Sequence, residues 1–254
     1  MFFIIQPLTS EVAGRGFHAT VPGMPENDLW KALSPAARSA LATRDYSTKM
    51  IEARELVGQS PIPGVEVFHR RIFQQRYRGH FGEFGRRGEG LLGKIGMWPN
   101  QWATALMYSG TSKGFHIHPP HIPEGTTPEA WFQRLFVQEP ENYALRPYPL
   151  EQWDCMFFIS GIAEMFLIDE RAGMPRKKVR FIIEGDDMPG PNNVGVVIPA
   201  GVAHAIRCAS SKDLIMVYGT STTFVPENEG RIEHAIETPL APPDWEAYWK
   251  RDEA

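Results

Sequence analysis

The sequence predicts a mainly β protein, built as an antiparallel sandwich or barrel, with a helical appendage before it and a helix-containing insertion within it. Short apolar segments follow one another between residues 65 and 218, and Gly or Pro stands at nearly every junction. The chain contains 22 Pro and 23 Gly, which argues against long uninterrupted helices in this part. Its 254 residues fit one large domain, or one domain with an appendage.

The strand candidates are segments of alternating or continuous apolar character that end at turn residues. They are 65–73, 81–84, 102–108, 113–118, 153–168, 179–183, 195–198, 203–208 and 214–218. Their order predicts strands joined mostly by short turns, with one long connection after residue 118.

Residues 24–57 predict helices. Their apolar side chains recur at spacings of three and four residues, at Leu29, Trp30, Leu33, Ala37 and Leu41. Ser34 before Pro35 is typical of a helix start, so we expect two helices here. This appendage either packs against one face of the barrel or serves as a lid or dimer brace.

The predicted organisation is an N-terminal strand and helical appendage at 1–60, a barrel at 61–240 and a C-terminal helix at 241–254. The insertion at 119–150 has its own helix signal, because Thr127 suits an N-cap and Pro128 the first turn. Aromatic residues follow between Trp131 and Phe136. These aromatic residues either cover a site beside the preceding strand or fill space next to the barrel.

Three histidines and an aspartate are the candidate metal ligands. In an extended strand, His116 and His118 project from the same face. Asp154 begins another candidate strand and is followed by six residues and then Gly161, and a Pro-x-Gly-x-x-His turn supplies His204. Three imidazoles and one carboxylate suit a borderline divalent metal such as Fe, Ni, Zn or Mn.

Two alternatives to this ligand set remain open. His121 and Glu124 follow the histidine pair directly, but they lie among prolines, so we expect them in an exposed loop. The histidines also fit a hydrogen-bonded cluster that holds no ion.

The order of these motifs resembles the cupin superfamily of jelly-roll β-barrels. Two features depart from that pattern: Asp154 replaces the usual glutamate, and the long segment 119–153 replaces a short gap. Within the superfamily the chain looks most like the dTDP-4-dehydrorhamnose 3,5-epimerases, over residues 62–240. The likeness rests on 78–83 (Arg-Gly-His-Phe-Gly-Glu), Gln101, 113–116, 198–204 and 226–232.

The resemblance implies roles for several residues. His116 corresponds to the family's general base, with Lys113 where the family has arginine. Phe81, Glu83, Gln101 and His204 would then face the substrate. Asp154 stands where the family has a catalytic lysine, and residues 221–224 stand in place of its tyrosine region. With the Asp154 carboxylate in place of a lysine, the site is better suited to bind a cation than to stabilise an oxyanion.

Three functions are compatible with this sequence. The first is an epimerase or isomerase acting on a carbonyl-bearing sugar or nucleotide-sugar, with a bound divalent metal. His116 would be the base, and either a metal or Lys113 would stabilise the enolate that forms. If His116 binds the metal, a metal-bound hydroxide or Glu83 would be the base instead. The second is a mononuclear metal-dependent oxygenase or hydrolase, and the third is a non-catalytic sugar-binding cupin.

Composition excludes several partners. A net charge of −4 without a long basic run argues against nucleic acid, and no apolar segment reaches the ~20 residues that span a bilayer. The apolar run at 1–5 is too short for a secretory signal, so we expect it to remain. Cys155 and Cys208 are too few for a disulfide framework, which predicts the cytoplasm. The resemblance further implies a homodimer in which strands near 78–83 reach the neighbouring site.

Overall fold

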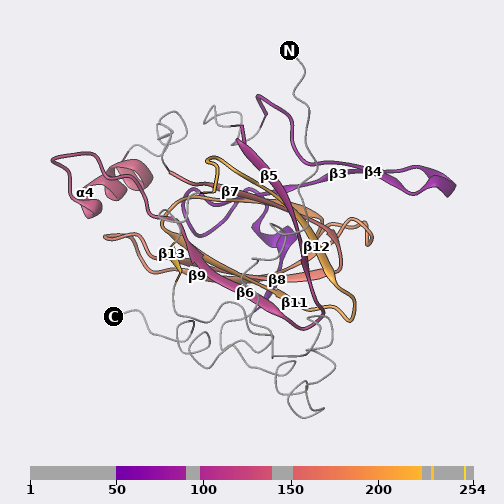
Figure 1. Cartoon of the computed structure of the whole chain (residues 1–254). Coiled ribbons are helices and arrows are strands. Elements are labelled where there is room, and N and C mark those ends of the chain that lie inside the picture. Colours follow the sequence, from indigo (N-terminus) through magenta and orange to yellow (C-terminus); the bar gives the residue numbers. More distant parts are fainter. Residues whose placement is uncertain (1–49, 90–97, 139–150, 225–229, 232–248, 250–254) are drawn as a thin grey trace, which may run out of the picture.

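The chain folds into two β-sheets packed face to face, with a separate hairpin at one side (Figure 1). The computed structural model describes residues 50–89, 98–138, 151–224, 230–231 and 249. Within these residues no strand pairing closes the two sheets into a barrel, so the fold is an open jelly-roll sandwich. The predicted mainly β jelly-roll is confirmed.

The six-stranded sheet has the order β1 (Ile51–Glu52), β9 (Lys178–Glu184), β8 (Ile162–Asp169), β11 (Val202–Cys208), β6 (Ser112–Ile117) and β13 (Gly230–Arg231). The five-stranded sheet has the order β2 (Glu66–His69), β10 (Val194–Ile198), β7 (Asp154–Ser160), β12 (Leu214–Thr220) and β5 (Gln101–Met107). The hairpin consists of β3 (Arg71–Gln74) and β4 (His80–Glu83). The described pairs are antiparallel except for β1 with β9.

Every predicted strand segment contains a strand. Segment 65–73 is divided at Arg70, and segment 153–168 is divided at Gly161. Gly161 has φ +88°, and a β carbon there would lie 2.9 Å from the Asp213 carbonyl oxygen, so the tight turn between β7 and β8 requires glycine.

The helical prediction for 24–57 is wrong at its described end. Residues 24–49 lie outside the described part, but Ile51 and Glu52 pair with β9, and a 3-10 helix, η2 (Ala53–Leu56), follows. Ala53 and Leu56 are buried in the main core. Tertiary pairing at the sheet edge has therefore overridden local helical periodicity.

The insertion helix is confirmed. α4 (Pro128–Gln133) begins after Thr127, whose hydroxyl oxygen accepts from the Ala130 amide, and it continues as a π-helical turn, η4 (Arg134–Gln138). A further 3-10 turn, η3 (Arg76–Arg78), forms the tip of the hairpin. Of the predicted C-terminal helix at 241–254, the structure describes Trp249, which is helical and buried.

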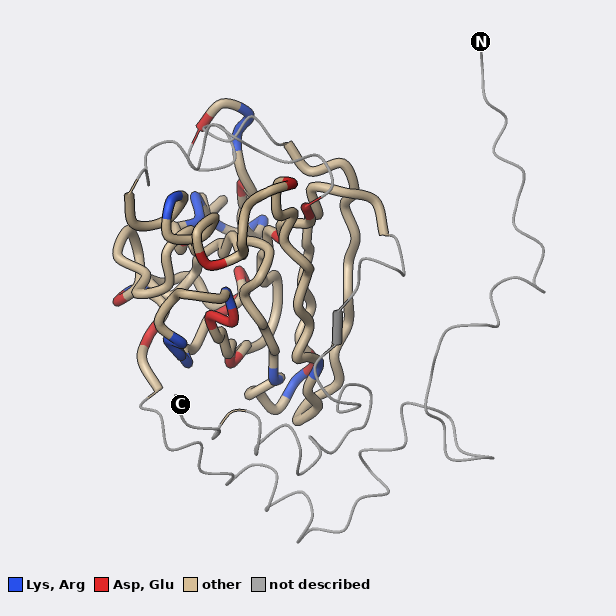
Figure 2. Tube along the Cα trace, turned by 90° about the vertical axis from the view of Figure 1, so that its left-hand side faces the viewer, with Lys and Arg blue, Asp and Glu red and all other residues tan. Residues whose placement is uncertain are grey.

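The main core lies between the sheets, because alternate residues of each strand face inward. Along β9, buried residues alternate with half-buried ones. A second cluster covers the outer face of the six-stranded sheet, where Trp249 packs on Phe115 and Phe166. Acidic and basic residues are intermixed along the trace (Figure 2). In the described part, no helix has the length and apolar character needed to cross a membrane.

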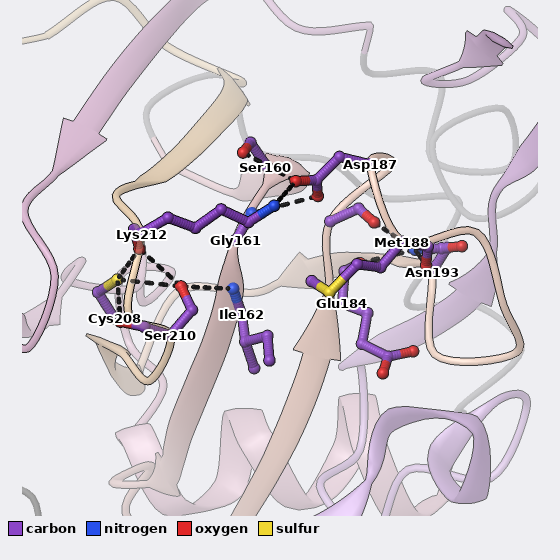
Figure 3. A network of polar contacts seen from close by, with 11 residues as sticks. Ser160, Gly161, Ile162, Glu184, Asp187, Met188, Asn193, Cys208, Ser210 and Lys212 are labelled. Atoms are coloured by element: carbon purple, nitrogen blue, oxygen red, sulfur yellow. Dashed lines mark hydrogen bonds and ion pairs between the residues drawn. The ribbon is translucent and has the colours of Figure 1, made fainter. Parts of the chain in front are cut away.

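Loop contacts fix the end of the sandwich at which β7 finishes (Figure 3). The Asp187 carboxylate accepts from the Ser160 hydroxyl at 3.1 Å and from the Gly161 amide at 3.2 Å, and it pairs with Lys212. The Asn193 amide donates to three backbone carbonyls of the neighbouring loop. With this end tied by polar loops, the start of β7 lies at the opposite end, where the candidate site is found.

Candidate metal and catalytic site

Three of the predicted ligands form one buried cluster between the sheets. His118 follows β6, His204 lies in β11 and Asp154 begins β7, and their ligand atoms all lie within 4.8 Å of one another. Asp154 Oδ2 is 3.1 Å from His118 Nε2 and 3.1 Å from His204 Nε2. The histidines thus belong to the six-stranded side and the carboxylate to the five-stranded sheet.

His116 lies next to this cluster without being one of its three members. It pairs with His204 across β6 and β11, and the two rings are nearly parallel, with centroids 5.9 Å apart. The His118 and His204 ring centroids are 5.6 Å apart. The three imidazoles therefore converge as the sequence predicts, and the assignment of His116 as a fourth metal ligand stays a prediction.

A β-bulge at Gly114 determines on which face of the sheet Lys113 lies. The register passes from His204–His116 to Ile206–Lys113, so β6 uses one more residue than β11 over this stretch. Gly114 has φ +115°, and a β carbon there would lie 2.5 Å from Ala205 Cα, so only glycine fits. The bulge brings Lys113 to the face that carries His116, as the sequence allowed, although the Lys113 side chain is exposed.

Hydrogen bonding fixes how His204 presents its ring. Nδ1 lies 3.2 Å from the Val202 carbonyl oxygen, which can only accept, so Nδ1 carries a proton. A neutral His204 therefore presents the lone pair of Nε2 to Asp154 Oδ2. Two electron-rich atoms at 3.1 Å need a positive charge between them, which an imidazolium proton or a metal ion supplies.

The electrostatics of Asp154 favour its ionised form. Burial alone would raise its pKa, but hydrogen bonds and charge interactions with His118 and His204 hold the pKa far below its usual range. An ionised carboxylate beside two imidazoles has the composition of a divalent cation site.

A second layer holds the carboxylate, and sequence reasoning missed it. The buried Gln152 side-chain amide donates to Asp154 Oδ1 at 3.0 Å and lies 3.2 Å from His118 Nε2. The Thr222 hydroxyl donates to Gln152 Oε1 at 3.2 Å, which orients that amide. Residues of this kind fix the rotamer of a metal ligand. No motif marks Gln152; its position two residues before Asp154 is the one available signal.

Gln101 lies in the same row of the five-stranded sheet as Asp154. Both residues pair with Thr220 of the intervening strand, so their side chains leave the sheet on one face. Gln101 Oε1 accepts from the Phe224 amide at 2.9 Å. This position is compatible with the substrate-facing role that the sequence predicts.

Phe81 and Glu83 lie on the hairpin, in a different sheet from the histidines. The Glu83 carboxylate pairs with Arg86 at 2.9 Å and Arg71 at 3.4 Å, and its hydrogen bond with Arg86 is the main cause that lowers its pKa. Phe81 is 52 % exposed. Within one described chain these two residues do not join the histidine cluster, and their roles stay predictions.

The alternative ligands His121 and Glu124 are exposed and are not members of the cluster. The expected loop exposure of both residues is therefore confirmed. The described part of the site thus has three buried ligand candidates, one adjacent imidazole and a layer of neutral amides and hydroxyls.

Comparison with known proteins gives the fold a context. No family model matches the chain. It is 27% identical over 164 residues to the spore coat polysaccharide biosynthesis protein SpsL of Bacillus subtilis (strain 168), and the match covers 63% of this chain and 83% of that protein.

The structure resembles ChmJ, a 3'-monoepimerase from Streptomyces bikiniensis that was solved in complex with dTDP-quinovose. The TM-score is 0.50 at 20% identity, over 68% of this chain and 72% of that chain. A double mutant of ChmJ in complex with dTDP gives a TM-score of 0.50 at 17% identity, over 68% and 71% of the two chains. At these identities the likeness shows a shared fold.

Proposed function

We propose that the protein is an epimerase or isomerase of a carbonyl-bearing sugar, with a nucleotide-sugar as the favoured substrate class. The proposal is supported by the fold shared with ChmJ and by the likeness to a polysaccharide biosynthesis protein. The observation that carries it is the buried cluster of His118, Asp154 and His204 with His116 beside it. Proton abstraction next to a carbonyl needs a base and a positive charge near the carbonyl oxygen.

We further propose that the cluster binds a divalent cation, with Fe, Ni, Zn and Mn as the candidates. Adjacent ligands around an ion with bonds of about 2.1 Å are separated by roughly 3 Å. The 3.1 Å separations between Asp154 Oδ2 and the two Nε2 atoms fit that spacing. When bound, the cation supplies a positive charge that stabilises negative charge on the substrate's carbonyl oxygen.

In this proposal His116 removes a proton from the carbon next to the carbonyl. The other side of that carbon then takes a proton that comes from solvent, which gives the epimer, and His116 releases the abstracted proton to solvent, so atoms and charge balance without an oxidant. Lys113 lies on the same side of β6 and would contact an anionic part of the substrate. With His118, Asp154 and His204 as ligands, His116 does not have to be both ligand and base.

Metal analysis tests the cation. Protein purified without added metal should contain about one transition metal ion per chain, and His118→Ala or Asp154→Ala should lose it because a three-ligand site tolerates no missing ligand. His69→Ala is the matched control, since His69 is exposed at the end of β2. Metal-free wild-type protein that also fails to bind added Zn²⁺ or Mn²⁺ would refute the metal site.

Isotope exchange tests the chemistry. Incubation with dTDP-4-keto-6-deoxyglucose in deuterated water should place deuterium on a carbon beside the carbonyl, and His116→Asn should stop the exchange. His121→Asn, an exposed histidine in the same segment, should leave it intact. If neither this nucleotide-sugar nor free keto sugars exchange, the epimerase proposal is wrong.

One observation favours a second candidate function. Two histidines and one carboxylate are also the ligand set of non-haem iron oxygenases. Recovery of bound iron together with substrate-dependent oxygen consumption would identify that class. Hydrolytic cleavage without deuterium incorporation would identify a hydrolase, and tight sugar binding without turnover a non-catalytic cupin.

We also propose a homodimer formed through the β3–β4 hairpin, which projects from the sandwich (Figure 1). Phe73 and Phe81 stack on its surface with centroids 6.3 Å apart, each 52 % exposed, and Tyr77 at its tip is fully exposed. Such an apolar surface is typical of an interface. Phe73→Ser with Phe81→Ser should yield a monomer in analytical ultracentrifugation, and an unchanged mass would contradict the proposal.

The cytoplasm is the proposed location. Support comes from Cys155 and Cys208, which are both buried free thiols.

A further inference from the structure

The described part of the insertion has an apolar cluster of its own. It consists of buried Trp131, Phe132, Leu135 and Phe136, with Ile122 and Met174 packed against them. This cluster lies on the loop that joins β8 to β9: the Gln133 side-chain amide donates to the Gly173 carbonyl, and a β carbon on Gly173 would lie 2.9 Å from Glu129 Cβ. The insertion is thus packed against the sheet that carries His204.

Arg171 joins this cluster to the sheet. Its side chain is fully buried, and Nε and Nη2 each donate to an Asp169 carboxylate oxygen at 2.7 Å. Nη2 also donates to the Pro63 carbonyl at 2.8 Å. The guanidinium carbon lies 3.9 Å from the centre of the Phe136 ring. Nη1 has no hydrogen-bond partner among the described residues, so the ring supplies the favourable contact for that part of the cation.

The aliphatic part of Arg171 lies against Gly201, the turn residue between β10 and β11. A β carbon on Gly201 would lie 2.6 Å from Arg171 Cγ, and φ there is +79°. The Gly201 amide donates to the His118 carbonyl at 2.8 Å, and the Gly201 carbonyl accepts from the Glu170 amide at 3.1 Å. The backbone of one cluster histidine is therefore bonded to the residue on which Arg171 packs, and His204 lies three positions further along.

We propose that Arg171 is a positioning residue that couples the insertion to the histidine cluster. The Phe136 ring fixes the position of the Arg171 guanidinium, and the aliphatic part of Arg171 then packs against Gly201. The Gly201 amide in turn donates to the His118 carbonyl and so fixes the backbone of His118. Cation–π contacts are strongest where both groups are desolvated, as they are here. The effect on metal binding rests on the proposed function, whereas the effect on Gly201 does not.

Phe136→Leu tests the coupling, because it keeps an apolar side chain and leaves the Arg171–Asp169 pair in place. Phe132→Leu is the matched control: it removes a ring from the same cluster, 6.3 Å from Phe136, but the ring over the guanidinium is that of Phe136. The first readout is hydrogen exchange at the Gly201 amide, normalised to global unfolding. The second is the affinity for Mn²⁺.

Phe136→Leu should speed Gly201 exchange about tenfold and weaken Mn²⁺ binding about tenfold, in the range expected for loss of an outer-layer contact. Phe132→Leu should change either quantity less than about twofold. Equal exchange at Gly201 in the two variants, or no change in Phe136→Leu, would overturn the coupling. Faster Gly201 exchange in a protein that is purified metal-free and binds neither Zn²⁺ nor Mn²⁺ would support the coupling and refute the proposed metal site.

Discussion

Glu151 is a buried carboxyl group at the base of the insertion. Oε1 accepts from the His121 amide at 2.7 Å, which ties the two ends of the insertion together. Burial raises the pKa of Glu151 to about 7, against the smaller opposing effect of that hydrogen bond. The free energy of unfolding should therefore depend on pH through Glu151, because ionisation of this side chain is disfavoured in the folded state.

The sign and size of the effect follow from proton linkage. Between an ordinary pKa of 4.5 and about 7, the folded chain keeps a proton that the unfolded chain has lost, so stability falls as pH rises. At 1.36 kcal/mol per unit, the whole shift corresponds to about 3 kcal/mol. This loss of stability begins at pH ~4.5, where the unfolded chain ionises, and is complete above pH ~7.

Glu151→Gln keeps the acceptor oxygen for His121 and removes the titration. Urea unfolding of both proteins at pH 5 and pH 8 gives the difference in their free energies of unfolding, in which the other titrating groups cancel. The variant should gain about 2.5 kcal/mol relative to wild type between the two pH values, because part of the shift already lies below pH 5. Glu124→Gln, an exposed position in the same insertion, is the control. A difference between Glu151→Gln and wild type that does not change with pH would refute the reasoning.

Three other substitutions test the architecture through urea denaturation. Gly114→Ala should lower the free energy of unfolding by about 3 kcal/mol, because a β carbon would collide with Ala205 at 2.5 Å in an unfavourable backbone conformation. Asp186→Asn should cost about 3 kcal/mol, because the Arg70 guanidinium is 1 % exposed and would lose its charge partner. Thr127→Ala should cost about 1 kcal/mol through loss of the N-cap of α4.

Control substitutions test whether the stability losses come from the specific contacts of Gly114 and Asp186 or would follow any change of a positive-φ glycine or an ion pair. Gly58 also has positive φ (+71°), but a β carbon there would meet no atom within 4 Å, so Gly58→Ala should cost only about 1 to 2 kcal/mol. Arg71 forms exposed pairs with Glu83 and Glu89, so Arg71→Met should leave the free energy of unfolding almost unchanged. Losses as large as those of Gly114→Ala and Asp186→Asn would contradict the packing argument.

Strand positions and the histidine pair were predictable because their signals are local. The alternation along Lys178–Glu184 reports which side of the strand faces the core, and the same period places His116 and His118 together. Thr127 and Pro128 likewise carry the start of α4 within a few residues. These patterns depend on backbone geometry that neighbours in sequence already determine.

Other features depend on contacts between distant segments. Besides its hydrogen bond to Asp154, Gln152 contacts residues 34 and 70 positions away, so its place two residues before Asp154 does not by itself reveal its role. Ile51 lies in a strand because Phe181 is beside it in space, although the sequence around it favours a helix. The ion pair of Glu83 with Arg71 likewise depends on the pairing of β3 with β4, although its second partner, Arg86, is only three residues away in sequence.

The cluster takes its histidines from one layer and its carboxylate from the other, so the thickness of the sandwich sets its geometry. Bulky apolar residues such as Phe158 and Met165 fill the space between the layers without belonging to the cluster. A change of side-chain volume at such positions would alter the distances between His118, Asp154 and His204. Substitutions in the apolar core between the sheets could therefore change the geometry of this cluster as readily as substitutions beside it.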